Sequence, residues 1–355
     1  MKTIPHSRPK IGAREAIAAA REIMAGHLAA GPKIGELENS VSDYTGRLYA
    51  RSTSSGTTAI QLALRAMGIG TGDSVIMPSY CCYSVYSAID NAGAIPVLAD
   101  VDAIVPNLSA ETVKKNLTKR TKAVIVPHMY GSLADIECIE SLGIPVIEDC
   151  AQAFGAVSWE GRAGSRGVVS ILSFYATKMM AGAKGGMILT DTLEISKRLE
   201  DLMRYDCRDT GGECYNLSMT NIEAAIALEQ LKRLDGFADK RFKLAEAYDN
   251  LLREKGLESI VMPRPLGSVP FRYVVRLPER LEIDEVMKSL DEEGVDVRTP
   301  VFRPLHTYFG MEGNLFPNTE SAQRHNLSLP IYPRLSFGSV SKVVDHLADH
   351  IKGGL

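Results

Sequence analysis

The sequence predicts an α/β protein with a large domain, built on a mostly parallel sheet covered by helices, and a smaller C-terminal α+β domain. Short apolar runs alternate with helical segments between residues 74 and 149. This alternation is typical of parallel strands joined by crossover helices. The length of 355 residues exceeds that of one typical domain and fits a large domain with a smaller partner.

Three regions are expected along the chain. Residues 1–12 form an N-terminal arm, because Pro5, Pro9 and Gly12 interrupt any regular element. Residues 13–240 form the large domain and residues 241–355 the small one. The boundary is placed at the start of a long connecting helix expected at 239–255.

The elements of the large domain follow from apolar periodicity. Helices are predicted at 13–27, 33–44, 59–67, 83–92, 108–117, 134–142, 193–204, 222–234 and 239–255. Strands are predicted at 48–50, 74–77, 95–101, 123–127, 146–149, 168–175 and 186–190. Three glycines at positions 182, 185 and 186 mark a tight loop between the last two strands.

The remaining chain combines short elements with proline-rich loops. We expect a strand at 271–275, a helix at 283–292, a strand at 295–297 and a last helix from residue 340. Residues 206–221, between two predicted helices, are polar and irregular. Long irregular segments inside a compact domain are often functional.

Composition excludes several classes of partner and site. The 40 basic and 43 acidic residues nearly balance, so nothing indicates binding to nucleic acid or to an anionic membrane. No apolar run is long enough to span a bilayer, and the N-terminus lacks the apolar core of a signal peptide, so a cytoplasmic protein is expected. The six cysteines have no metal-binding spacing, which predicts free thiols and no metal site.

A Ser/Gly/Thr loop at residues 52–58 opens the helix predicted at 59–67. Backbone N–H groups at a helix start favour an anion such as phosphate, and Gly56 would let the backbone approach it closely. Serine and threonine are also good helix caps. From this loop alone, simple capping is the favoured interpretation.

Two buried strands are followed by ionisable groups, Asp149 and Lys178. The carboxyl ends of parallel strands meet at one edge of a sheet, where ligands collect, so we expect both side chains in one crevice. A desolvated lysine amine is a good nucleophile for a carbonyl, and a carboxylate can keep a pyridine nitrogen protonated. These are the two protein groups that pyridoxal phosphate needs. Taken singly, each residue is better explained as a surface lysine just past a strand or as a helix-capping aspartate.

The ordered set of motifs carries a resemblance over nearly the whole chain. It includes Glu-Asp-Cys-Ala-Gln at 148–152 and Ser-Phe at 173–174, followed by Lys178. Further matching motifs lie at 7–9, 31–32, 54–59, 78–80, 93–97, 128–131, 215–216, 224–226 and 231–235. In this respect the chain resembles the DegT/DnrJ/StrS family of pyridoxal-phosphate-dependent sugar aminotransferases, which have the fold type I architecture of aspartate aminotransferase.

The resemblance implies a role for each matched residue. Lys178 would bind the cofactor covalently and then shuttle the proton, and Asp149 would face the pyridine nitrogen. Gln152 would hydrogen-bond the oxygen side of the ring. Asn216 would reach into the partner's site across a homodimer with composite active sites. The residues implied to hold the phosphate are Gly56, Thr57 and Ser173.

Three positions depart from the family pattern. Cys82 stands where an aromatic ring usually covers the cofactor, so either Tyr83 takes that place or a thiol does. Lys184 replaces a usual glutamate and reverses a charge near the site, and Ser218 replaces a frequent basic residue. His128 and His306 are given no catalytic role.

The sequence therefore predicts an aminotransferase that moves an amino group, expected from glutamate, to a keto-sugar, expected to be nucleotide-linked. A cyclitol ketone remains an alternative acceptor. A related cofactor-dependent sugar dehydratase is a second alternative, against which the lysine at 178 and the scattered cysteines argue. A non-catalytic regulatory relative is a third.

Overall fold

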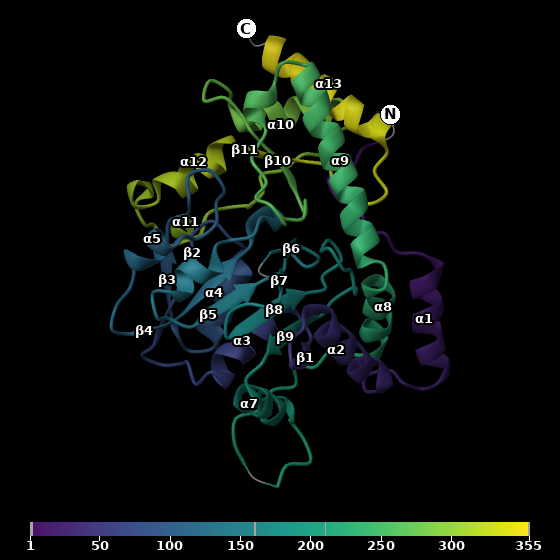
Figure 1. Cartoon of the computed structure of the whole chain (residues 1–355), viewed down its shortest axis with the longest axis vertical. Helices are drawn as coiled ribbons and strands as arrows, with labels where there is room; N and C mark the ends of the chain where they lie inside the picture. The colour runs from purple at the N-terminus through teal and green to yellow at the C-terminus, as the bar shows by residue number, and fades with distance from the viewer. Residues whose placement is uncertain (1–2, 160, 210, 354–355) are drawn as a thin grey trace.

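A seven-stranded sheet lies at the centre of the large unit in the computed structural model, which describes residues 3–159, 161–209 and 211–353 (Figure 1). The strand order is β1-β9-β8-β5-β4-β2-β3. All neighbouring strands pair in parallel except that β9 runs against both β8 and β1. The strands are β1 (Tyr49–Thr53), β2 (Ser74–Pro78), β3 (Ile95–Ala99), β4 (Thr121–Pro127), β5 (Val146–Asp149), β8 (Val169–Ser173) and β9 (Gly186–Thr190).

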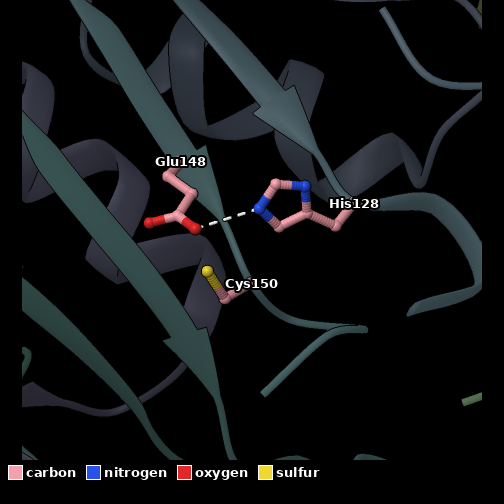
Figure 2. A group of neighbouring side chains, drawn as sticks. All are labelled: His128, Glu148 and Cys150. Carbon is pink, nitrogen blue, oxygen red and sulfur yellow. Dashed lines mark hydrogen bonds and ion pairs between the residues drawn. The ribbon is translucent and has the colours of Figure 1, made fainter. Parts of the chain in front are cut away.

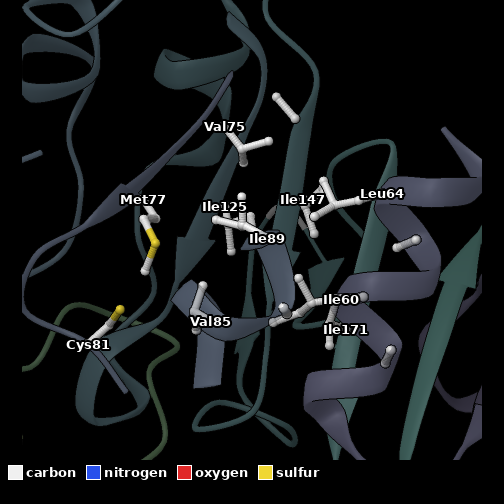
Figure 3. Packing of buried hydrophobic residues seen from close by; sticks show 14 of the residues in the cluster. Ile60, Leu64, Val75, Met77, Cys81, Val85, Ile89, Ile125, Ile147 and Ile171 are labelled. Atoms are coloured by element: carbon white, nitrogen blue, oxygen red, sulfur yellow. The ribbon is translucent and has the colours of Figure 1, made fainter. Parts of the chain in front are cut away.

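Helices cover both faces of this sheet because side chains alternate along each strand. The helices of the large unit are α1 (Ala13–Met24), α2 (Pro32–Thr45), α3 (Gly56–Ala66), α4 (Tyr83–Asn91), α5 (Ala110–Lys114), α6 (Ile136–Glu140), α7 (Leu193–Met203) and α8 (Asn221–Leu231). Figure 3 shows one packed face, where Ile60 and Leu64 of α3 and Ile89 of α4 lie against strand residues such as Ile125 and Ile147.

The opposite face is covered by different helices. Val124 and Val146 pack with Ile139 of α6, while Leu172 packs in a separate cluster with Leu37 of α2. All of these side chains are fully buried. The central strands are thus buried on both faces, as is usual for a parallel sheet, and the polar residues at their ends are not part of the apolar core.

The C-terminal unit packs at one end of the sheet and has its own apolar core, which also includes Ile4 of the N-terminal arm (Figure 1). The long helix α9 (Leu234–Glu254) leads into it. Its other elements are β10 (Tyr273–Arg276), β11 (Asn326–Leu329), α10 (Ile283–Glu292), α11 (Leu305–Tyr308), α12 (Pro317–His325) and α13 (Phe337–Gly353). Strands β10 and β11 pair antiparallel. The division of the chain at residue 240 stays a prediction, and α9 runs through that point.

Several local expectations differ from the structure. The predicted strand at 295–297 forms only isolated bridges, from Val295 to Ile4 and from Arg298 to Ser328. Its place beside β10 is taken by β11, which the sequence analysis did not predict. The predictions also missed α11, α12 and the small hairpin of β6 (Val157–Ser158) and β7 (Gly161–Arg162). Helices α5 and α6 are shorter than predicted.

The antiparallel direction of β9 has a simple cause. Only residues 174–185 separate β8 from β9. A parallel crossover usually carries a helix, and this glycine-rich loop of twelve residues contains none, so it returns the chain directly along β8. Its consequence is that β9 begins at the same edge at which β8 ends, with Ser173 opposite Gly186.

Among the residues described, no helix is both long and apolar enough to cross a membrane.

Candidate active site

One edge of the sheet gathers the residues that the sequence singled out. Strands β4, β5 and β8 end there at Pro127, Asp149 and Ser173, and β1 leads there into the Ser/Gly/Thr loop. A cavity of about 280 Å³ lies at this edge. Its lining includes Gly56, Thr57, Asp149, Gln152, Ser173 and Lys178.

The loop before α3 both caps the helix and forms part of the cavity. The Ser55 hydroxyl accepts a hydrogen bond from the Thr58 N–H at 3.1 Å, and the Thr58 hydroxyl accepts one from the Ser55 N–H at 3.0 Å. The capping interpretation is therefore correct for these two residues. Gly56 and Thr57, between them, line the cavity at the positive end of an 11-residue helix.

Glycines allow the walls of this cavity to approach one another. A Cβ on Gly56 would lie 3.0 Å from Ser173 Cβ, so a side chain there would close the space beside the serine hydroxyl. A Cβ on Gly186 would lie 2.5 Å from the carbonyl carbon of Ser55. The backbone at the start of β9 therefore packs directly against the backbone of the Ser/Gly/Thr loop.

Lys178 lies in a turn that follows β8, where its N–H donates to the Tyr175 carbonyl at 2.8 Å. Its Nζ lies 5.5 Å from the centre of the Phe271 ring. Burial lowers the pKa of the Lys178 ammonium, and Asp149 opposes this shift. A lowered pKa increases the fraction of free amine, which is the form that attacks a carbonyl.

Asp149 and Glu148 are adjacent on β5 and have opposite environments. Burial raises the pKa of Asp149, whose carboxylate accepts one backbone hydrogen bond, from the Ala151 N–H at 2.9 Å. Burial also pushes the pKa of Glu148 upward, but hydrogen bonds from His128 and the backbone bring it below its usual value. Asp149 lines the cavity and is available to a ligand, whereas Glu148 is committed to the protein.

Glu148, His128 and Cys150, which do not line this cavity, form a buried cluster of neighbouring side chains, two of which flank Asp149 in the chain (Figure 2). The Ala134 N–H donates to His128 Nδ1 at 3.0 Å, which places the ring proton on Nε2. His128 Nε2 donates to Glu148 at 3.0 Å. Glu148 also accepts from the Ser170 hydroxyl and from two backbone N–H groups, at 164 and 166. These donors make the cluster a hydrogen-bonded support for the strand end that carries Asp149.

Gln152 and Cys82 occupy two further walls of the cavity. The Gln152 side-chain oxygen accepts from the Tyr130 N–H at 3.1 Å, which holds the amide in place. Tyr83 does not line the cavity. It is 45 % exposed and packs on Tyr86 and Tyr308, with ring centroids 5.4 and 5.1 Å apart. Of the two residues that the sequence offered for covering the cofactor ring, Cys82 lines the cavity and Tyr83 does not.

Asn216 is the predicted site residue that does not line this cavity. It is exposed, in the segment between α7 and α8 that extends beyond the body of the molecule in Figure 1. The same segment contacts the Ser/Gly/Thr loop through its backbone, where the Leu217 carbonyl accepts from the Ser54 N–H at 2.7 Å.

The sequence analysis gave no site role to several residues that line the cavity. Ser84, Tyr175 and Thr177 are polar lining residues of this kind. Tyr175 and Thr177 lie just before Lys178 in the same turn. Their closeness to the lysine along the chain could have indicated that they line the cavity. Ser84 lies in the first turn of α4, just after the loop that follows β2. The only signal for it in the sequence was this position after the end of a strand.

Comparison with known proteins decides the family. A model of the DegT/DnrJ/EryC1/StrS aminotransferase family matches residues 10–348. The chain belongs to this family. As a member it is an aminotransferase of fold type I, and its cofactor is pyridoxal phosphate.

Solved structures of this aminotransferase class are similar along the whole chain. DesV from S. venezuelae is 30 % identical with a TM-score of 0.91, covering 99 % of both chains. TlmJ from Streptoalloteichus hindustanus is 28 % identical with a TM-score of 0.92, covering 99 % of this chain and all of TlmJ. DesI, described in the presence of its TDP-sugar product, is 26 % identical with a TM-score of 0.91, covering 99 % of this chain and 94 % of DesI.

The cavity fits the cofactor of the family. Gly56 leaves open the space beside Ser173 that a Cβ would fill, at the start of a helix that favours a phosphate. The buried carboxylate of Asp149 has a single hydrogen bond and can accept one more from a protonated ring nitrogen. Lys178 lines the same cavity and has the amine that covalent attachment of the cofactor would need.

Proposed function

We propose that this aminotransferase moves an amino group from glutamate to the keto group of a sugar that is carried on a nucleotide. The observation that carries the proposal is the convergence of Lys178, Asp149 and the loop at Gly56 on one cavity. The sugar assignment is supported by the likeness to DesI, whose structure was described with a TDP-sugar product. The donor rests on the family resemblance of the sequence.

Each lining residue has a proposed task. Pyridoxal phosphate, when bound, supplies an electron sink for the carbon that gains or loses a proton. Lys178 Nζ takes the proton from that carbon and returns it, and the lowered pKa of this amine favours its action as a base. Asp149 holds a proton on the ring nitrogen through a charge-assisted hydrogen bond. The groups proposed to hold the phosphate are Gly56, Thr57 and Ser173, with Gln152 on the oxygen side of the ring.

We further propose a homodimer in which Asn216 completes the partner's site. The exposed position of Asn216, outside its own chain's cavity, supports this arrangement. Closed two-fold dimers are the commonest oligomers, and a shared site makes the single subunit inactive.

The function is tested with purified protein loaded with pyridoxamine phosphate and offered a panel of nucleotide-linked keto-sugars and cyclitol ketones. We expect amino product from at least one nucleotide-linked keto-sugar, with return of the yellow pyridoxal form. A Lys178→Ala variant is the control and should give no product. Amination of a cyclitol ketone alone would replace the proposed acceptor class.

A further inference from the structure

A second cavity of about 360 Å³ adjoins the first one. Tyr175 and Thr177, which flank the lysine-bearing turn, line both cavities. The remaining walls come from distant parts of the chain, namely the N-terminal arm, helix α9 and the C-terminal unit. They are His6, Ser7, Arg241, Phe271, Arg272, Asp296, Arg298 and Ile331.

Arg272 stands out because its charge has no acidic partner among the described residues. Its Nη1 makes two long contacts, with His6 Nε2 at 3.4 Å and Ser328 Oγ at 3.5 Å. Its Nε is buried and has no hydrogen-bond partner among the described residues. Burying a guanidinium with so few partners costs stability, and a bound oxyanion would remove that cost.

His6 does not neutralise this arginine, and it adds no charge of its own. Burial and then the nearby Arg272 lower the pKa of His6 to about 3, so its ring is neutral near neutral pH. A neutral ring can accept from Arg272 through Nε2, which the Ser328 hydroxyl also approaches at 2.9 Å. The guanidinium charge therefore remains uncompensated.

Arg241, which is buried, adds a second cation to the same wall as the partly buried Arg272. Arg241 Nη1 donates to three backbone carbonyls, and no carboxylate lies within ion-pair distance in the part of the chain that is described. The Phe271 ring connects these cations to the catalytic lysine. The ring centre lies 5.6 Å from Arg272 Cζ, 5.9 Å from Arg241 Cζ and 5.5 Å from Lys178 Nζ.

The lining contains one carboxylate, Asp296, and it is already engaged. Asp296 binds Arg298 through both of its oxygens, at 3.1 Å each, and accepts from the His6 N–H at 3.2 Å. Asp296 and Arg298 thus neutralise each other's charge. The lining as a whole keeps an excess of positive charge from Arg241 and Arg272.

We propose that this second cavity is an oxyanion subsite, in which Arg272 binds a carboxylate or phosphate of a reactant while Lys178 acts on the other end of the same molecule. The inference rests on the proposed function, because it needs Lys178 to be the reacting amine. A guanidinium binds carboxylate and phosphate through two parallel hydrogen bonds, so both remain chemically matched to Arg272. The carboxylate would come from the amino donor and the phosphate from the acceptor.

Binding to the cofactor-loaded protein is the first test, with glutarate and thymidine diphosphate as unreactive probes. Arg272→Met should weaken the binding of at least one probe by about tenfold or more, because it removes a charge-assisted pair. Arg276→Met is the matched control on the same strand. Arg276 donates to Ser321 at 2.8 Å and lines neither cavity, so its loss should leave both affinities within about twofold of the parent.

A second variant acts in the opposite direction and does not depend on removing a buried arginine. Asp296→Asn takes away the only carboxylate among the described lining residues, so it should tighten binding of the same probe severalfold. Unchanged binding of both probes in Arg272→Met and Asp296→Asn would overturn the subsite. Equal losses in Arg272→Met and Arg276→Met would do the same.

The two half-reactions identify the source of the oxyanion. If Arg272→Met raises the half-saturating concentration of glutamate alone, the subsite takes the donor carboxylate. If it raises that of the keto-sugar acceptor alone, the subsite takes the phosphate. Borohydride labelling of Lys178 in the parent separates the two hypotheses, since absent labelling refutes the proposed function and normal labelling with unchanged probe affinities refutes the subsite alone.

Discussion

The two cavities that meet at the lysine turn are built in different ways. The cofactor cavity is lined by segments that follow successive strands of one sheet, such as Asp149 after β5 and Ser173 at the end of β8. The second cavity is lined by side chains that are far apart in the sequence, such as His6, Arg241 and Arg272. The proposed reaction chemistry would thus rest on a regular framework, while the proposed recognition of a reactant would depend on how three parts of the chain pack together.

Their electrostatics differ in the same sense. In the first cavity a lysine and an aspartate act on each other's pKa, and the site carries both signs of charge. In the second, two guanidiniums face one carboxylate that is already paired. The first cavity thus offers a carboxylate as well as cations, whereas the second, whose carboxylate is already paired, is suited to an anion.

The largest expected effect comes from removing the lysine of the first cavity. Lys178→Ala should lower turnover by a factor of about 10² to 10⁴ or more, since the variant loses both the covalent attachment and the proton shuttle. Borohydride treatment of the parent should fix the cofactor to Lys178, as located by mass spectrometry of peptides. An adduct on Lys184 would show that Lys178 is not the lysine that binds the cofactor.

Subunit mixing tests whether the first cavity is complete within one chain. Lys178→Ala and Asn216→Ala variants, each impaired alone, are mixed and allowed to exchange. If Asn216 acts across the interface, each heterodimer has one intact site, and an equal mixture should recover about a quarter of the parent activity. Verified exchange without recovery would place Asn216 at its own subunit's site.

The buried cluster behind Asp149 should matter for stability more than for chemistry. Glu148→Gln leaves buried donors poorly matched, so the free energy of unfolding should fall by about 3 kcal/mol or more at pH 7. The depressed pKa of Glu148 means that its contribution is present above the unfolded value, near about 4.3, and is lost as the pH falls through the folded value. Denaturant titrations should show the gap between parent and variant narrowing below about pH 4.

The neighbouring carboxylate supplies the control for that measurement. Burial raises the pKa of Asp149, so its ionised form costs folding free energy in the protein without cofactor. Asp149→Asn should therefore leave cofactor-free stability unchanged or higher. If Asp149→Asn lowers the free energy of unfolding as much as Glu148→Gln does, then Asp149 also supports the fold and is not reserved for a ligand.

Asp149→Asn should reduce turnover while the cofactor is retained. The neutral amide cannot keep the ring nitrogen protonated, and the loss of one charge-assisted hydrogen bond costs roughly 1.5–3 kcal/mol, or about 10- to 150-fold in rate. Turnover is measured at saturating donor, with the cofactor content of the variant determined by absorbance. A rate within twofold of the parent would mean that another group faces the nitrogen.

The smallest effect is expected at the mouth of the first cavity. Lys184 lines it and is exposed, so its charge is screened over about 8–10 Å at physiological salt. If it attracts an anionic acceptor, Lys184→Glu raises the acceptor's KM a few-fold at low salt, spares the glutamate half-reaction and loses its effect as salt rises. An equal, salt-independent change in both half-reactions would instead show that the residue shapes the loop around the cofactor.

The sequence by itself predicted the parallel framework and the residues at its strand ends. Apolar runs of a few residues identify buried strands, and the polar residue after each run marks the functional edge, as Asp149 illustrates. The direction of β9 was not predicted, although the short loop between β8 and β9 contained the information. The pairing of β11 with β10 was also missed, although the four residues of β11, Asn-Leu-Ser-Leu at 326–329, alternate polar and apolar side chains as a strand does.

Other features were decided only by tertiary structure. Whether Cys82 or Tyr83 lines the first cavity depends on how α4 packs against Tyr308, which lies more than two hundred residues away in the sequence. The lack of an acidic partner for Arg272 is likewise visible only after the arm, α9 and the C-terminal unit have been brought together. Residues at strand ends can be identified from the local pattern of apolar and polar residues. The net charge of a cavity, by contrast, depends on residues that are distant in the sequence and become neighbours only in the folded chain.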